Sequence, residues 1–239
     1  MNESFLFHLL APGLALLLIL GTTMALPASA GTFVYVGCAD DSEIHVLQLD
    51  RSSGDLTKIE RVPIPGVTEP GTSTPLAVSP DRRFLYAATR GKPKIAAGFS
   101  INPGTGRLTF VASGPLADSM AYISTDRTGR FLLAASYPGN KITVNPIGPP
   151  GTVQPPHQIL TNHPNAHSIL VSPDNRHVLA TTLGNDLVNQ FKFDATTGRL
   201  APGTPPSVSV RTGAGPRHFV FHPNGRLVYV IGELNGAIF

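Results

Sequence analysis

The sequence is short of cysteine, tryptophan and charge. Its 239 residues include one cysteine, Cys38, and no tryptophan, and only 14% of them are charged. A lone cysteine excludes a disulfide within the chain and a cysteine-based zinc site. We interpret Cys38 as a small buried residue of the first strand. Because 41% of the residues are hydrophobic, we expect the fold to depend on an apolar core.

Clusters of basic residues are also missing. The formal net charge is only +3, and four of the arginines belong to one repeated turn: Arg83, Arg130, Arg176 and Arg226. A nucleic-acid surface requires lysines and arginines gathered on one face, often with aromatic residues between them. The sequence has no such stretch, and it therefore predicts no nucleic-acid partner.

Helix breakers, in contrast, are abundant. The chain contains 24 glycines and 23 prolines, spread along its whole length. Proline removes a backbone donor and kinks a helix, so a helical bundle could not carry so many. This composition favours an all-β fold of short strands joined by turns.

The first thirty residues read as an export signal. An apolar run over residues 5–20 continues to Ala28-Ser29-Ala30, the small-x-small pattern of a cleavage site. Pro12 and Gly13 interrupt the run, which is short for a membrane span. We predict a signal peptide over residues 1–30 with cleavage after Ala30. The mature protein would then be periplasmic or secreted, without stable membrane insertion.

Two sets of similar segments recur along the rest of the chain. The first set carries the turn anchors Ser79, Ser124, Ser172 and His222, which are 45, 48 and 50 residues apart. The second set carries the turn glycines Gly54, Gly106, Gly151 and Gly198, which are 52, 45 and 47 residues apart. Two independent markers with one period indicate a repeat protein.

Each repeat divides into four short strands. The first complete copy, for example, begins with a strand at Leu76–Val78, followed by a Ser-Pro-Asp turn and a continuous apolar strand at Phe84–Ala88. Four strands per 45–50 residues is typical of a β-propeller blade, and continuous apolar strands fit blades that are covered on both faces. We predict a partial β-propeller over residues 31–239. The repeats account for about four and a half blades, so we expect an incomplete ring.

The repeat register also predicts a functional site. Six residues before the turn proline, or before Thr125 in its place, stand Thr74, Ser119, His167 and Arg217. The antiparallel second strands return to the same mouth of the central channel, where they end near Arg90, Tyr137, Leu183 and Glu233. Titratable residues gathered at a concave mouth are the usual mark of a site.

We predict His167, Arg217 and Glu233 as catalytic residues, and His218 and Arg90 as substrate-binding residues. Structural interpretations remain open for each: Arg217 and Glu233 could pair only for stability, and Arg90 could be a solvated loop residue. We interpret His157, His163 and His177 as loop or surface residues, because they share no register.

Several of these segments are similar to one known family. FVYVG (33–37), NAHSILVSPDNR (165–176), GAGPRHFVFHPNG (213–225) and GELN (232–235) resemble, in order, the lactonase family of seven-bladed propellers. That family includes bacterial 6-phosphogluconolactonases and a fungal muconate-lactonizing enzyme. The resemblance implies hydrolysis of a sugar lactone, and it implies further blades beyond Phe239. Its active-site histidine, arginine and glutamate correspond to His167, Arg217 and Glu233, although Gly232 replaces the usual asparagine.

For such an enzyme, we expect His167 to act as the base on water and Arg217 to stabilise the oxyanion or to hold an anionic substrate group. Glu233 would orient them, and no metal or organic cofactor would be required. The alternative is a non-catalytic exported propeller that binds a partner or a glycan through its rim. A propeller subunit of a cofactor-dependent oxidoreductase is a third, weaker interpretation.

Overall fold

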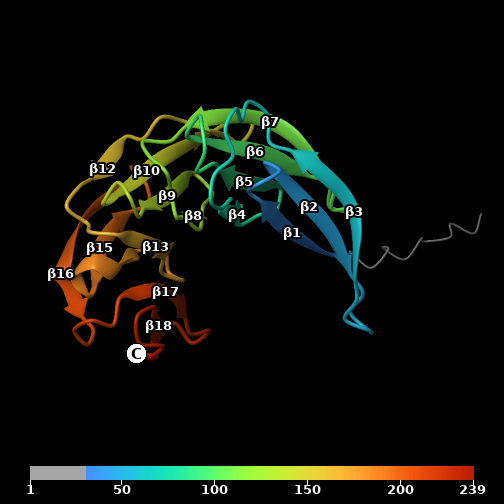
Figure 1. Cartoon of the computed structure of the whole chain (residues 1–239). Helices are drawn as coiled ribbons and strands as arrows, with labels where there is room; N and C mark the ends of the chain where they lie inside the picture. The colour runs from blue at the N-terminus through green and yellow to red at the C-terminus, as the bar shows by residue number, and fades with distance from the viewer. Residues whose placement is uncertain (1–30) are drawn as a thin grey trace, which may run out of the picture. The chain divides into compact units, whose positions relative to one another are not determined.

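The structure, a computed structural model, describes residues 31–239, which form one compact unit. The predicted signal peptide, residues 1–30, lies outside the described residues. Five antiparallel sheets follow one another along the chain and are arranged as an arc within this unit (Figure 1). The sheets are β1 (Thr32–Cys38), β2 (Glu43–Leu49) and β3 (Leu56–Pro63); β4 (Leu76–Val78), β5 (Phe84–Ala88), β6 (Ile95–Ile101) and β7 (Leu108–Pro115); β8 (Tyr122–Thr125), β9 (Phe131–Ser136), β10 (Lys141–Gly148), β11 (Thr152–Val153) and β12 (Gln158–Leu160); β13 (Ala166–Val171), β14 (His177–Thr182), β15 (Leu187–Asp194) and β16 (Arg199–Ser209); and β17 (Pro216–Phe221) with β18 (Val228–Gly232).

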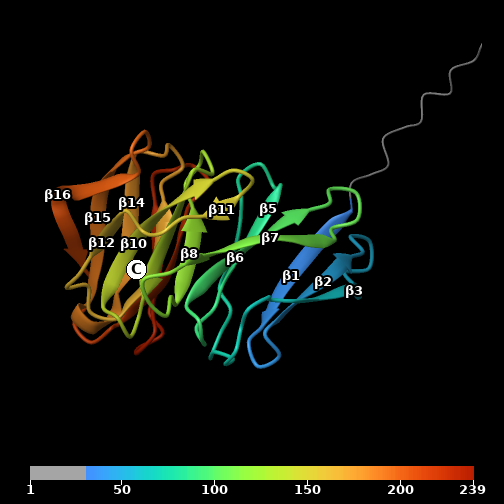
Figure 2. The same cartoon turned by 90° about the horizontal axis from the view of Figure 1, so that it is seen from above.

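Each of the three central sheets begins with a short strand on the inner side of the arc and proceeds outward, strand by strand. The first strands β4, β8, β13 and β17 contact one another in sequence (Figure 1). Figure 2 shows the sheets following one another from β1–β3 to β14–β16. The predicted all-β fold of propeller blades is therefore confirmed. Within residues 31–239, the first sheet has no inner strand, as the repeat pattern predicts, and the fifth contains two strands.

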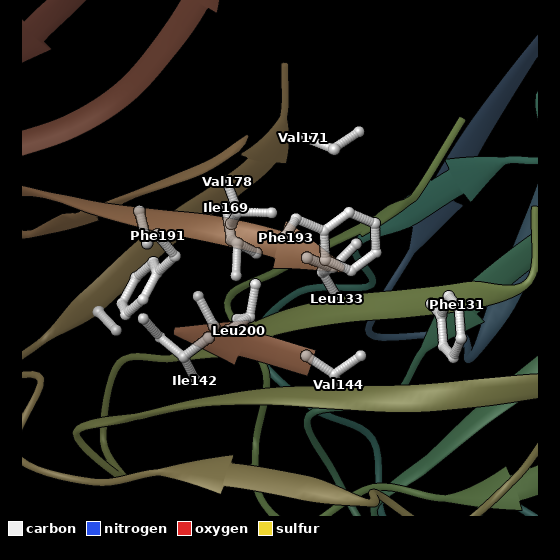
Figure 3. Close-up of a cluster of buried hydrophobic side chains, with 13 residues drawn as sticks. Phe131, Leu133, Ile142, Val144, Ile169, Val171, Val178, Phe191, Phe193 and Leu200 are labelled. Carbon is white, nitrogen blue, oxygen red and sulfur yellow. The ribbon is translucent and has the colours of Figure 1, made fainter. Parts of the chain in front are cut away.

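The core lies between the sheets. Four clusters of buried side chains occupy the four junctions between consecutive sheets. In the largest, Phe131, Leu133 and Val144 of the third sheet pack against Ile169 and neighbouring residues of the fourth (Figure 3). All six residues of β9 are buried, because this strand has a sheet against both faces. This double coverage explains why the second strands are continuously apolar in the sequence.

The turn that follows each first strand shows that the predicted repeat register is wrong in the third sheet. In every copy a backbone N–H closes the turn on the carbonyl five residues later, from Ser79 to Phe84 (2.8 Å), Asp126 to Phe131 (3.0 Å), Ser172 to His177 (2.8 Å) and His222 to Leu227 (2.9 Å). The anchor of the third sheet is therefore Asp126, and the prediction of Ser124 was wrong. Asp126 occupies the place of a serine because its carboxylate accepts the same backbone N–H, that of Phe131, as the Ser79 hydroxyl accepts from Phe84.

This correction changes one predicted site position. Counting five residues back from each anchor gives Thr74, His167 and Arg217 as predicted, but it gives Ala121 in place of Ser119 in the third sheet. The inner mouth of this sheet thus carries a small apolar side chain at the position where the fourth and fifth sheets carry a histidine and an arginine.

Candidate active site at the inner strand ends

His167 and Arg217 both lie where a strand departs from regular pairing. The β13–β14 register shifts between Ala166 and Ile169, and the β17–β18 register shifts between Pro216 and Phe219. Such irregularities free backbone groups from the ladder and re-aim the side chains they carry. Two successive sheets therefore present a polar residue to the same mouth by the same local device.

The three predicted catalytic residues are in contact. Nε of Arg217 donates a hydrogen bond to Nε2 of His167 at 3.0 Å, and the same nitrogen lies 2.6 Å from Oε2 of Glu233. Glu233 directly follows β18, and its backbone N–H bonds the carbonyl of Gly215, close before Arg217 in the chain. Arg217 thus connects the base candidate to the carboxylate.

His218 extends this group on the other side. Its ring centroid lies 4.9 Å from that of His167 and 5.7 Å from that of Tyr122. Tyr137, at the end of the second strand of the third sheet, approaches His167 with its ring centroid at 6.0 Å. His167 is consequently enclosed by two rings and a guanidinium, and it is 8% exposed.

Arg90 belongs to the same mouth but not to the same cluster of contacts. Its Nε donates to the hydroxyl of Ser119 at 3.2 Å, and its Nη1 donates to that of Ser73 at 3.1 Å. Both partners are neutral hydroxyls, so these hydrogen bonds do not balance the positive charge of Arg90. An anionic group entering the mouth would therefore meet a fixed cation.

A cavity of about 740 Å³, the rim cavity, joins these residues. Arg90, His167, Arg217 and His218 line it, together with the register positions Thr74 and Ala121. Glu233 is not among the lining residues, and it contacts one of them, Arg217. Sequence reasoning missed Asp40 and Tyr122, which also line the rim cavity. Asp40 follows β1 in a turn, where no repeat register exists to identify it.

The environment keeps the histidines neutral. Burial, aided by the charges of Arg217, His218 and Arg90, lowers the pKa of His167 to about 4. Burial and the Arg217 guanidinium also lower the pKa of His218, and Glu233 opposes this effect. Because Nε2 of His167 accepts the Arg217 proton, its own proton must reside on Nδ1. The only lone pair of the His167 ring is therefore on Nε2, where it accepts the Arg217 hydrogen bond.

Away from the rim cavity, a group of three titratable side chains has a spacing suited to a metal ion. Among the described residues, Asp41, Glu43 and His45 bring ligand atoms within 4.8 Å of one another. Arg61 already balances this cluster, with Nε 2.8 Å from Glu43 Oε2 and Nη2 3.8 Å from Asp41 Oδ2. A guanidinium at this place would compete with a cation.

Small antiparallel sheets follow one another in an arc, and polar residues from successive inner strands meet at one cavity; this architecture is that of a partial β-propeller. Residues 33–239 match the family described as lactonase, 7-bladed beta-propeller, and the chain belongs to this family. Within the described residues, no helix is long and apolar enough to cross a membrane.

Relatives and solved structures agree with this assignment. The chain is 40% identical to the 6-phosphogluconolactonase of Yersinia pestis over 205 residues, which cover 86% of this chain and 59% of the Yersinia protein. It is similar to the periplasmic gluconolactonase of Pseudomonas aeruginosa, with TM-score 0.74, 26% identity and coverage of 87% of this chain and 63% of that one. A Bacteroides fragilis structure at 22% identity, with TM-score 0.77 and coverage of 90% and 64%, shares the fold. The chain thus spans about three fifths of the length of these relatives.

Proposed function

We propose that the protein hydrolyses a sugar lactone in the rim cavity. The observation that carries this proposal is the contact of Arg217 with both His167 and Glu233, made beside a cavity large enough for a sugar. Membership of the lactonase family and similarity to 6-phosphogluconolactonases support it.

The chemistry follows from what each side chain can hold. Arg217 first turns away from His167, which frees the Nε2 lone pair. Water then attacks the lactone carbonyl carbon while Nε2 of His167 takes a water proton. The Arg217 guanidinium stabilises the oxyanion that forms. The ring C–O bond then breaks, and the imidazolium returns the proton to the leaving alkoxide. The product is an open-chain hydroxy acid, formed without redox change.

The lowered pKa of His167 affects the two proton transfers in opposite ways. A histidine below its ordinary pKa is a weaker base, so the attack of water benefits less from it. Its conjugate acid is correspondingly stronger, which favours protonation of the alkoxide. Arg90 is suited to hold a phosphate or carboxylate of the substrate, because its hydrogen bonds go to neutral hydroxyls.

The decisive experiment measures acid release from 6-phosphogluconolactone and from unphosphorylated glucono-δ-lactone, above the spontaneous rate. We expect His167→Ala to lower kcat by roughly 10²–10⁴-fold, the range for a lost general base. His157→Ala is the matched control, since His157 bonds the carbonyl of Gly198 away from the rim cavity. Wild-type activity that survives His167→Ala would remove the base role, and no activity on any lactone would refute the enzyme proposal.

A non-catalytic binding function is the second candidate. It is favoured by one observation: the Arg217 hydrogen bond occupies the very nitrogen of His167 that would act as base. Calorimetry with gluconate and 6-phosphogluconate distinguishes the two. Tight binding of these acids without turnover of their lactones would support the binding module.

We also propose that the protein is exported through residues 1–30. The small-x-small pattern at Ala28–Ala30 supports this, as does similarity to a relative described as periplasmic. N-terminal sequencing of protein expressed with its leader should find Gly31 first. A soluble cytosolic product that retains Met1 would refute export.

A further inference from the structure

The backbone carbonyl of Arg217 is held by the neighbouring sheet. The register shift in β17 takes Arg217 out of the regular ladder with β18. Its carbonyl oxygen instead accepts hydrogen bonds from two hydroxyls of the fourth sheet, Ser168 Oγ at 2.9 Å and Thr181 Oγ1 at 2.5 Å. A carbonyl has two lone pairs and can accept both.

These two hydroxyls form a closed unit, the hydroxyl pair. Ser168 and Thr181 are 1% and 0% exposed, respectively, and their oxygens lie 3.1 Å apart. The backbone N–H of Ser168 donates to Thr181 Oγ1 at 3.2 Å. Each hydroxyl has a single proton. When both protons are donated to the Arg217 carbonyl, neither hydroxyl donates to the other.

The blade core does not require hydroxyls at these positions. Nine residues after the turn anchor, where the fourth sheet has Thr181, the second and third sheets have the buried residues Ala88 and Ala135. Four residues before the anchor, where it has Ser168, they have Pro75 and Tyr122. A buried hydroxyl is costly unless it is bonded, so its presence here calls for a specific partner. That partner is the carbonyl of Arg217.

The side chain and the main chain of Arg217 both bond the dipeptide His167-Ser168. His167 accepts from the Arg217 side chain, and the adjacent Ser168 donates to the Arg217 main chain. Thr181, on the paired strand β14, adds the second donor. A shift of the fifth sheet relative to the fourth would break these contacts together.

We propose that Thr181 and Ser168 are positioning residues that fix the Arg217 backbone across the sheet junction and so direct its guanidinium at His167. The role in catalysis rests on the proposed lactone hydrolysis. Neither side chain lines the rim cavity, so neither is expected to touch the substrate.

The experiment compares Thr181→Val, which keeps the shape and removes the hydroxyl, with Thr181→Ser, which keeps the hydroxyl. Thr143→Val is the matched control, because Thr143 is also fully buried and its hydroxyl bonds Asn145 instead of a site residue. Three quantities are measured for the full chain: kcat and KM on 6-phosphogluconolactone, and the pKa of His167 by NMR titration.

We expect Thr181→Val to lower kcat by about 10-fold or more with little change in KM, since a displacement of ~1 Å can cost on the order of 10²-fold. The pKa of His167 should rise at the same time, because the Arg217 charge that depresses it moves away. Thr181→Ser should restore most of both values, and Thr143→Val should change neither. Because burial also lowers the pKa of His167, the Thr143→Val control and the Thr181→Ser variant separate a displaced Arg217 from a general loosening of the fold.

Three results separate the possibilities. Unchanged kcat and unchanged His167 pKa in Thr181→Val would overturn the positioning role. A wild-type chain inactive on every lactone would refute the proposed function, and the His167 pKa would then decide the positioning role alone, a rise supporting it and no change overturning it. Ser168→Ala, which removes one donor and leaves the other, supplies the same comparison where Thr181→Val does not fold.

Discussion

Arg217 donates its Nε proton to Nε2 of His167 across the junction between the fourth and fifth sheets, at 3.0 Å. A protonated imidazole has no lone pair at that nitrogen, so this contact exists only with neutral His167. Protonation of His167 at Nε2 therefore requires that this hydrogen bond break first. Glu233, 2.6 Å from the same Arg217 nitrogen, retains the arginine at the site whichever state His167 is in.

The first prediction concerns pH. His167 can accept a proton from water only while it is neutral, and its pKa is lowered to about 4 by burial and by Arg217, His218 and Arg90. We expect kcat/KM to stay level as the pH falls through 6.5 and to decline only near pH 4. The acid limb should move upward in Arg217→Ala, where one depressing charge is lost. An acid limb at pH 6 to 7 in the wild type would contradict this.

The second prediction concerns the shape of Arg217. Arg217→Lys keeps the charge, but a lysine cannot donate to His167 from an inner nitrogen while it presents terminal N–H groups to substrate. We expect kcat to fall by at least about 10-fold, in line with a lost oxyanion donor. Steady-state kinetics of Arg217→Lys and Arg217→Ala test this. Full activity of the lysine variant would show that only the charge matters.

Glu233 should behave differently from Arg217. The two side chains are nearly half exposed, so solvent screens their ion pair and its loss should cost little stability. Glu233→Gln leaves the Arg217 charge unbalanced, which should lower KM for a phosphorylated lactone while looser orientation lowers kcat. Comparison with the unphosphorylated lactone, whose KM should not fall, is the control. Equal changes for both substrates would refute the electrostatic explanation.

Much of the candidate site could be predicted from the sequence, because a repeat constrains where equivalent residues lie. His167 and Arg217 occupy one register position in consecutive copies, and antiparallel pairing brings Glu233 back to them. The sequence could not show that the turn of the third sheet is anchored by Asp126, since a carboxylate and a serine hydroxyl do the same hydrogen bonding there. Nor could it show the register shifts in β13 and β17, which depend on pairing between strands.

The roles of Ser168 and Thr181 illustrate the same limit. Serine and threonine within apolar strands are common, and only their distance to the carbonyl of a residue some 36 to 49 positions away distinguishes them. The depressed pKa of His167 likewise follows from burial and from charges contributed by other sheets, which no local pattern encodes.

A stability prediction follows from the corrected register. The buried carboxylate of Asp126 accepts from the backbone N–H groups of Thr128, Arg130 and Phe131 and from the side chain of Asn175. Asp126→Ala would leave these donors without their acceptor and should lower the free energy of unfolding by on the order of 3 kcal/mol. Asp126→Ser should lose less, because the serine anchors Ser79 and Ser172 bond the equivalent N–H. Thermal denaturation of both variants measures the difference, and equal losses would contradict the equivalence of the anchors.

The last prediction concerns the dynamics of the fifth sheet. β17 and β18 pair with each other, and on its other side β18 bonds a short segment, Ala237 to Phe239. Val220 is 60% exposed, whereas every residue of β9 is buried. Amides with few buried neighbours open at low free energy, so we expect β18 to exchange hydrogen far faster than β9 in a mass-spectrometric experiment. Arg217 would then be carried by the least protected sheet of the described residues, and its contacts with His167, Ser168 and Thr181 would limit how far it departs. Exchange in β18 as slow as in β9 would show that the fifth sheet is stabilised by contacts that the arc of residues 31–239 does not account for.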